Sequence, residues 1–188
     1  MLVAICFLVT LIRNRPLPLA PEHAFIKPSL EGLPAMSACW IEFDRNIAPG
    51  QAATAGFTRL HTWELTASGL LIRHPKGNIL IDVGNSSHFQ EEIADYPLWS
   101  HLHFEILTGG KSAAHRAPEV LRNSGIAPWT VSAVLLSHVH MDHAGGVMDL
   151  PGVPILLSPE ELDFVNRNRD TRTIQVVPGH ARAIQGTR

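Results

Sequence analysis

The sequence has few cysteines, little net charge and no apolar run long enough to cross a membrane. Its two cysteines, Cys6 and Cys39, form no CxxC motif, which excludes a disulfide-rich scaffold. They are either one disulfide of an exported protein or two small apolar residues. The 15 Lys and Arg residues nearly balance the 17 Asp and Glu residues, and the charges are interspersed. A basic nucleic-acid-binding surface and a disordered acidic tail are therefore not expected.

The N-terminal region carries the longest apolar run, residues 2–12 (LVAICFLVTLI), followed by Arg13 and Arg15. This run is shorter than the roughly 20 apolar residues of a bilayer span. Residues 1–14 therefore predict a signal or membrane-anchor segment, which favours a membrane-anchored or exported protein over a cytoplasmic one. A buried terminal strand or helix is the alternative. Prolines recur from residue 16 to residue 34, so residues 15–55 are expected to form an extended, Pro-rich tether.

Residues 56–188 have the pattern of a compact domain in which strands and helices alternate. The expected elements are a hairpin (70–73 and 78–83), one or two short helices within 86–110, a helix (117–124), strands (129–136 and 153–157), a helix (158–166) and a strand (173–177). Ser158 and Glu161 have the spacing of a capping box at the start of the 158–166 helix. Trp40, Trp63 and Trp129 are expected to pack in the core or against the hairpin. The alternation predicts an α/β layered fold.

Four candidate metal ligands follow the 129–136 strand within six residues: His138, His140, Asp142 and His143. His138 and His140 are two apart, so in extended backbone they project to the same side. Asp142 and His143 come where the chain bends, just before Gly145, and can face the same point from a second direction. Imidazole nitrogens with a carboxylate oxygen suit Zn²⁺ or a similar divalent ion. We therefore expect a metal site here; a decayed or structural remnant is the alternative.

Residues 137–146 (SHVHMDHAGG) resemble the metal-binding signature of the metallo-β-lactamase-fold hydrolases. The resemblance extends to residues 71–84 (LIRHPKGNILIDVG), an early hairpin ending in Asp-x-Gly, and to residues 120–136 and 154–162. It covers roughly residues 60–165. The fold that it implies is an αββα sandwich, of which this chain would hold the first half.

The resemblance also implies roles for individual residues. His138 and His140 would bind a first metal ion, and Asp142 and His143 a second one where the site is dinuclear. The ions would be one or two Zn²⁺, with Mn²⁺ or Fe²⁺ as alternatives. Asp82 would orient the ligand loop by hydrogen bonds, unless it is a plain residue of the strand-end turn. A metal-bound hydroxide would attack the substrate carbonyl, and Asp142 would also serve as the catalytic proton acceptor.

The chain departs from the family pattern after His143. A complete site needs a third His for the first metal, a bridging Asp and a final His, and His180 is the only later histidine. His180, within Pro-Gly-His, is either that third ligand or a residue of a surface loop. We expect the chain to be the N-terminal part of a longer enzyme. The alternative is a short product with a mononuclear site or none.

The resemblance predicts a metal-dependent hydrolase that acts on a small molecule. The HPKGN hairpin and the PEEL helix look most like those of the quorum-quenching N-acyl homoserine lactonases, so a lactone or ester substrate is expected. A glyoxalase-II-like thioesterase is the alternative enzyme. A catalytically inactive, membrane-tethered binding domain is the alternative of another class. His101 and His103 form a second HxH pair, which fits either an ordinary amphipathic helix or the wall of a substrate pocket. The sequence does not indicate an oligomeric state.

Overall fold

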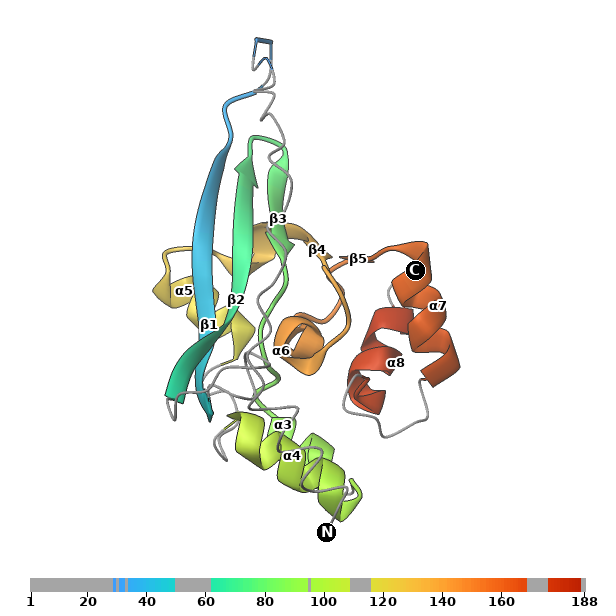
Figure 1. Cartoon of the computed structure of the whole chain (residues 1–188). Coiled ribbons are helices and arrows are strands. Elements are labelled where there is room, and N and C mark those ends of the chain that lie inside the picture. The colour runs from blue at the N-terminus through green and yellow to red at the C-terminus, as the bar shows by residue number, and fades with distance from the viewer. Residues whose placement is uncertain are drawn as a thin grey trace, which may run out of the picture.

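The computed structural model describes residues 29, 31–32, 34–49, 62–94, 96–108, 116–168 and 176–186. Its centre is a five-stranded sheet in the order β1-β2-β3-β4-β5 (Figure 1). The α/β prediction is confirmed, because strands and helices share one core. Residues 1–14, predicted to be a signal or anchor, lie outside the described residues. No described helix has the length and hydropathy needed to cross a membrane.

The first three strands are antiparallel neighbours: β1 (Ser37–Pro49), β2 (Thr62–His74) and β3 (Gly77–Ile81). The predicted hairpin is confirmed by the pairing of β2 with β3 around a tight turn. The predicted tether ends earlier than residue 55, because residues 37–49 form β1. The dense run of prolines ends at residue 34, and beyond it Ile41 and Phe43 alternate as buried residues of a strand.

The last two strands run parallel to β3 and to each other: β4 (Val131–Leu135) and β5 (Ile155–Leu156). Helix α5 (Ala117–Asn123) and the 3₁₀ turn η1 (Pro128–Thr130) lead into β4. The 117–124 helix is confirmed. The 129–136 strand begins two residues later than predicted, because Pro128 opens a 3₁₀ turn, and the 153–157 strand is reduced to two paired residues.

Five more helices and a second 3₁₀ turn complete the described elements, and two of these helices lie within 86–110, where one or two were predicted. They are α3 (Phe89–Ile93), α4 (Leu98–Thr108), α6 (Met141–Ala144), η2 (Gly145–Asp149), α7 (Pro159–Asn168) and α8 (Pro178–Gly186). The backbone N–H of Glu161 donates to Ser158 Oγ, which confirms the cap of α7. Val176 and Val177, placed in a strand by prediction, belong to none, and residues 173–175 lie outside the described part.

The main core lies between one face of the sheet and the helices α5, α6, α7 and α8. Leu71, Leu80 and Val134 are fully buried on this inner face. A second apolar cluster joins α3 and α4 to the segment that carries the candidate ligands: Phe89, Ile93, Tyr96, Phe104, Met141 and Val177. Met141 is the first residue of α6, so its burial in this cluster fixes the start of the ligand-bearing helix.

Three tryptophans were expected in the core or against the hairpin, and the core alternative is wrong. The exposed fractions of Trp40, Trp63 and Trp129 are 68%, 41% and 83%. Trp40 lies opposite Leu70 of the hairpin strand β2. Cys39 in β1 is a free, half-buried thiol, and Cys6 lies outside the described residues.

Candidate metal centre

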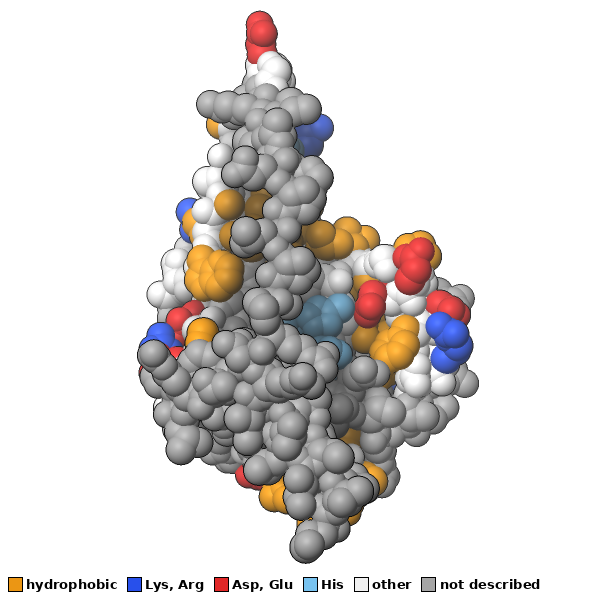
Figure 2. Space-filling view, in the orientation of Figure 1, with side chains coloured by type: hydrophobic (Ala, Val, Ile, Leu, Met, Phe, Trp, Pro, Cys, Tyr) orange, Lys and Arg blue, Asp and Glu red, His pale blue; other side chains and the backbone are white. Residues whose placement is uncertain are grey.

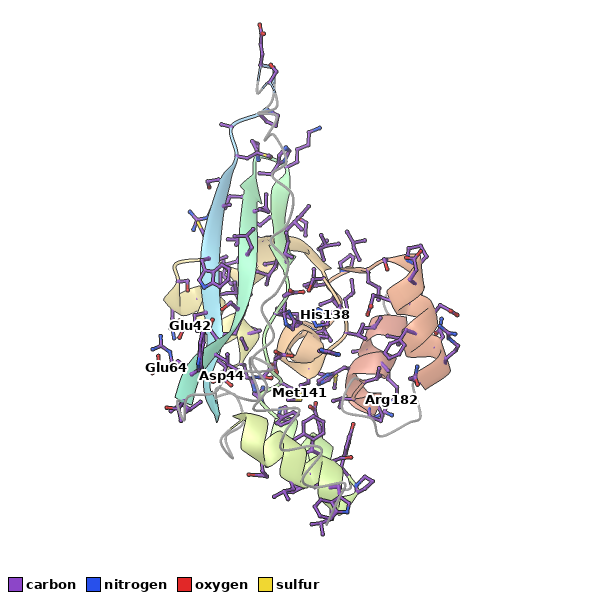
Figure 3. All side chains as sticks on the ribbon, in the orientation of Figure 1. Glu42, Asp44, Glu64, His138, Met141 and Arg182 are labelled. Carbon is purple, nitrogen blue, oxygen red and sulfur yellow. The ribbon has the colours of Figure 1, made fainter. Side chains whose placement is uncertain are left out.

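The structure gathers the four predicted ligands where the chain leaves β4. His138 and His140 lie in the loop after the strand, and Asp142 and His143 lie in the single turn of α6. The ring centroid of His138 is 4.6 Å from that of His140 and 4.1 Å from that of His143. The Nε2 atom of His143 lies 3.6 Å from Asp142 Oδ2. Figure 3 shows His138 close to α6, beside the carboxyl ends of β3 and β4.

Asp82 fixes this loop from the end of β3. Its carboxylate accepts three bonds: from the backbone N–H of Ser137 at 2.8 Å, from Ser137 Oγ at 2.7 Å and from His143 Nδ1 at 2.9 Å. Asp82 is also the one non-glycine residue with positive φ (57°) among the described residues. Asp and Asn tolerate this conformation better than most residues do. Its backbone and its carboxylate therefore both serve the turn that meets the ligand loop.

These bonds determine which ring nitrogens stay available. A carboxylate only accepts hydrogen bonds, so Nδ1 of His143 carries a proton, and in the neutral ring Nε2 keeps its lone pair. The hydroxyl of Ser137 donates its single proton to Asp82. Its oxygen therefore accepts a hydrogen bond from His138 Nδ1, at 3.0 Å. Nε2 of His138 therefore also keeps a lone pair with which it can coordinate a metal ion. Histidines that bind a metal through one ring nitrogen are commonly oriented by a hydrogen bond from the other ring nitrogen.

The protonation state of His138 fits the same role. Burial lowers the pKa of His138, and the neighbouring His143 and His140 lower it further, so this ring is neutral at pH 7. Neutral imidazole is the form that binds a metal. The bond to Asp82 raises the pKa of His143 despite its burial. Burial works to raise the pKa of Asp82, but the bonds from His143 and Ser137 outweigh it, so that pKa is lowered and Asp82 stays ionised.

Two further features hold the loop, and the sequence pattern did not reveal them. Glu161 Oε2 accepts the backbone N–H of Val139, between His138 and His140, at 3.2 Å. The capping-box pattern had assigned this side chain to its own helix. The second feature is the close approach of α6 and η2 to the end of β3. Val83 N donates to His143 O and Gly146 N donates to Gly84 O, and a Cβ on Gly146 would overlap the carbonyl of Val83.

The donor chemistry of the four side chains fits a borderline divalent cation. The imidazoles of His138 and His143 can each present Nε2 to a cation, and the side chain of Asp142 is 45% exposed beside His143. Across the described part of the chain, however, no three His, Cys, Asp or Glu side chains are drawn together as a finished coordination group. The residue types fit a metal ion, and binding it would require these side chains to move closer together.

His180 does not lie in a surface loop, one of the two alternatives predicted for it. It lies in α8, is only 1% exposed, and its Nε2 atom is 3.0 Å from Glu92 Oε2. The surface-loop prediction is therefore wrong, because Pro178 begins a helix rather than a turn. In the structure His180 pairs with a carboxylate of α3. His101 lies in α4, which agrees with the amphipathic-helix interpretation.

Comparisons with known proteins agree with this geometry. The family model of the metallo-beta-lactamase superfamily matches residues 62–161. Comparison with curated proteins gave no match. Among solved structures, an N-acyl homoserine lactone hydrolase with N-hexanoyl-L-homoserine bound at its catalytic metal center is 19% identical, with a TM-score of 0.58 over 80% of this chain and 56% of that one.

Two further solved structures share the fold. An AiiA variant from B. thuringiensis with N-decanoyl-L-homoserine bound is 19% identical, with a TM-score of 0.59 over 80% of this chain and 56% of that one. AidC, a dizinc quorum-quenching lactonase, is 20% identical, with a TM-score of 0.54 over 82% and 57%. The chain thus spans a little over half the length of these structures. The family match covers more than half of the chain and includes the ligand segment, and so the chain belongs to the metallo-beta-lactamase superfamily.

Proposed function

We propose that this chain carries the metal-binding part of a metal-dependent hydrolase that cleaves an ester or lactone carbonyl. The observation that supports this most directly is the bonding around Asp82. Asp82 bonds Nδ1 of His143, whose Nε2 lies 3.6 Å from the Asp142 carboxylate, and Ser137, which Asp82 also bonds, holds Nδ1 of His138. The Nε2 atoms of both rings point away from these bonds and can meet a metal ion. His138 and His140 would hold one Zn²⁺, and Asp142 and His143 would hold a second where two ions bind, with Mn²⁺ or Fe²⁺ as substitutes.

A bound divalent cation would supply Lewis acidity and a lowered pKa for water. The chain's own residues would do the rest. Asp82, Ser137 and Glu161 keep the ligand loop in one conformation, which saves reorganisation when substrate arrives. Asp142 is half-exposed on the open side of α6, so its carboxylate can accept a proton from an attacking water. No serine or cysteine nucleophile is required.

The lactone substrate rests on fold likeness to lactonases, and a thioester is the competing substrate. Both present a carbonyl to the same site. Turnover of an N-acyl homoserine lactone and of an acyl-glutathione thioester by the zinc-loaded protein separates the two. Faster lactone opening supports the proposal, whereas exclusive thioester cleavage would replace it with the glyoxalase-II-like alternative.

Metal content of the purified chain tests the site itself. We expect zinc to be retained after dialysis against metal-free buffer, and lost in His140→Ala. His101→Ala is the matched control, because it removes a histidine of the other HxH pair. Trace metal in the wild type, unchanged after reconstitution with Zn²⁺, Mn²⁺ or Fe²⁺, would instead favour an inactive binding domain.

We also propose that residues 1–14 act as a signal or membrane anchor ahead of this domain. The support is the apolar run of residues 2–12. Fusing residues 1–34 to a reporter protein and fractionating the cells tests this. Reporter found only in the cytosol would contradict it.

A further inference from the structure

Helix α6, which carries Asp142 and His143, is a single turn of four residues and is too short to be stable by itself. Its ligand side is open, since the side chains of Asp142 and His143 are 45% and 32% exposed. Figure 2 shows histidine side chains at the visible surface over α6 and the loop before it. The position of these two ligands therefore depends on what α6 contacts on its buried side.

The C-terminal end of α6 rests on the segment that joins β3 to α3. Gly145, the C-cap of α6, is buried, and its N–H donates to Met141 O. A Cβ on Gly145 would overlap the backbone nitrogen of Ser86 and would lie 2.7 Å from the carbonyl carbon of Asn85. In so close a packing, a shift of Ser86 displaces the end of α6.

Ser86 is in turn fixed by Glu92 of α3. Ser86 is fully buried, and its Oγ donates to Glu92 Oε1 at 3.0 Å. The other carboxylate oxygen, Oε2, accepts from His180 Nε2 of α8, also at 3.0 Å. Nδ1 of His180 is buried with no partner among the described residues, so the bond to Glu92 is the one that orients this ring. A carboxylate can accept both bonds at once, one on each oxygen.

We propose that Glu92 is a positioning residue for the metal ligands of α6, a role that rests on the metal site proposed above. The Glu92 carboxylate ties Ser86 to His180, and Ser86 supports the C-terminal end of α6 through Gly145. The apolar cluster that α3 shares with Met141 supports the other end. One short helix, α3, therefore holds α6 at both ends and attaches it to α8.

Amide hydrogen exchange of the metal-free chain tests this positioning directly. The backbone N–H groups of Ala144 and Gly146 are hydrogen-bonded at the end of α6 and the start of η2, and that of Val134 is bonded within the sheet. Glu92→Gln leaves one acceptor oxygen for two donors. Exchange at Ala144 and Gly146 should therefore quicken about 10-fold relative to exchange at Val134. Leu121→Val is the matched control: it trims a fully buried side chain of α5 and should change all three amides alike.

Titration of the whole chain with Co²⁺, followed by the visible absorption of the bound ion, gives the second readout. Glu92→Gln and Ser86→Ala should each lower the Co²⁺ affinity about 10-fold, as is typical of residues that orient metal ligands. The double variant should bind no more weakly than the weaker single variant, because both residues act along one chain of contacts. The absorption band should change in Glu92→Gln and stay as in wild type in Leu121→Val, since the band depends on the coordination geometry.

Two results would overturn the proposal. One is equal acceleration of all three amides in Glu92→Gln, and the other is a pair of affinity losses that multiply in the double variant. A wild-type chain that binds no Co²⁺ would contradict the metal site itself, and the exchange rates would still decide whether Glu92 holds α6. If Glu92→Gln does not fold, Ser86→Ala gives the same exchange comparison, because it removes the bond to Glu92 and keeps the carboxylate paired with His180.

Discussion

A single carboxylate, that of Asp82, links the backbone turn after β3 to the candidate ligands. It bonds the residue before His138 and the ring of His143, so one side chain sets both the loop position and a tautomer. The family resemblance implied this orienting role, and a plain residue of the strand-end turn was the alternative. The bonds of the Asp82 carboxylate to Ser137 and His143 favour the orienting role. Glu161 plays a comparable part from α7, but its bond to Val139 N joins residues 22 positions apart, which no local pattern reveals.

Replacing Asp82 with Asn should loosen the loop without abolishing the fold. Asn tolerates the positive φ, but its amide cannot accept from both Ser137 and His143 as the carboxylate does. We expect His143 to lose its fixed Nδ1–H tautomer, as read by ¹⁵N NMR of the imidazole, and zinc affinity to fall about 10- to 100-fold.

Asp149→Asn is the control for that substitution. Asp149 bonds Ser87 and the N-terminus of α5, away from the ligand loop. Its variant should keep the His143 tautomer and the zinc affinity. Equal losses in both variants would mean that Asp82 has no specific orienting role.

At the scale of elements, α6 and η2 sit directly against the end of β3, and glycine makes that approach feasible. Gly146→Ala would force the backbone of Val83 away from η2. We expect the free energy of unfolding to fall by about 3 kcal/mol, the upper range for overpacking, because the obstructing atom is backbone. Urea denaturation measures this.

Gly179→Ala in α8 is the matched control for Gly146→Ala. A Cβ there would meet Met148 Cε at 3.7 Å, an ordinary contact, and alanine favours a helix over glycine by up to about 1 kcal/mol. We expect unchanged or slightly higher stability. A Gly146→Ala protein as stable as the control would show that η2 can move without cost.

Helix α8 is attached to α3 through Glu92, which accepts from His180 Nε2 and from Ser86 Oγ, both at 3.0 Å. Burial works to raise the pKa of Glu92, but the bonds from His180 and Ser86 and the charges of His180 and His88 lower it overall. A lowered folded-state pKa stabilises the protein above the unfolded value near 4.5, and this contribution is lost as the pH falls through the folded-state pKa.

Glu92→Gln should therefore be less stable than wild type by about 2 kcal/mol at pH 7, and the difference should shrink as the pH falls below the unfolded value of 4.5. Urea midpoints at each pH test this. Glu91→Gln removes the neighbouring exposed carboxylate, which bonds His88, and should give a small and flat difference. A Glu92→Gln difference that does not shrink as the protein is acidified would contradict the assignment.

The sequence predicted local elements well and long-range ones poorly, for physical reasons. The β2–β3 hairpin, α5 and the Ser158 cap follow from residues a few positions apart. Strand β1 pairs with β2, which begins 13 residues after β1 ends. The prolines that precede β1 do not indicate this pairing. His180 was misplaced because its burial depends on Glu92, 88 residues earlier. The exposed tryptophans were misjudged because size alone does not say which sheet face a residue occupies.

At the scale of the whole molecule, the inner face of the sheet builds the core, and the ends of its strands present the ligand loop. Trp40 lies on β1, outside that loop, so Trp40→Glu should leave zinc affinity unchanged.

Zinc should stabilise the whole fold, because the ligands are brought together only in the folded chain. At a free zinc concentration of about 100 times Kd the gain is about 2.7 kcal/mol, which for a chain of this size raises Tm by roughly 5–10 °C. His140→Ala should abolish the rise, and His101→Ala should keep it. Differential scanning calorimetry with and without zinc measures both. A rise that survives in His140→Ala would place the bound zinc elsewhere, since the ligand loop would then contribute nothing to its affinity.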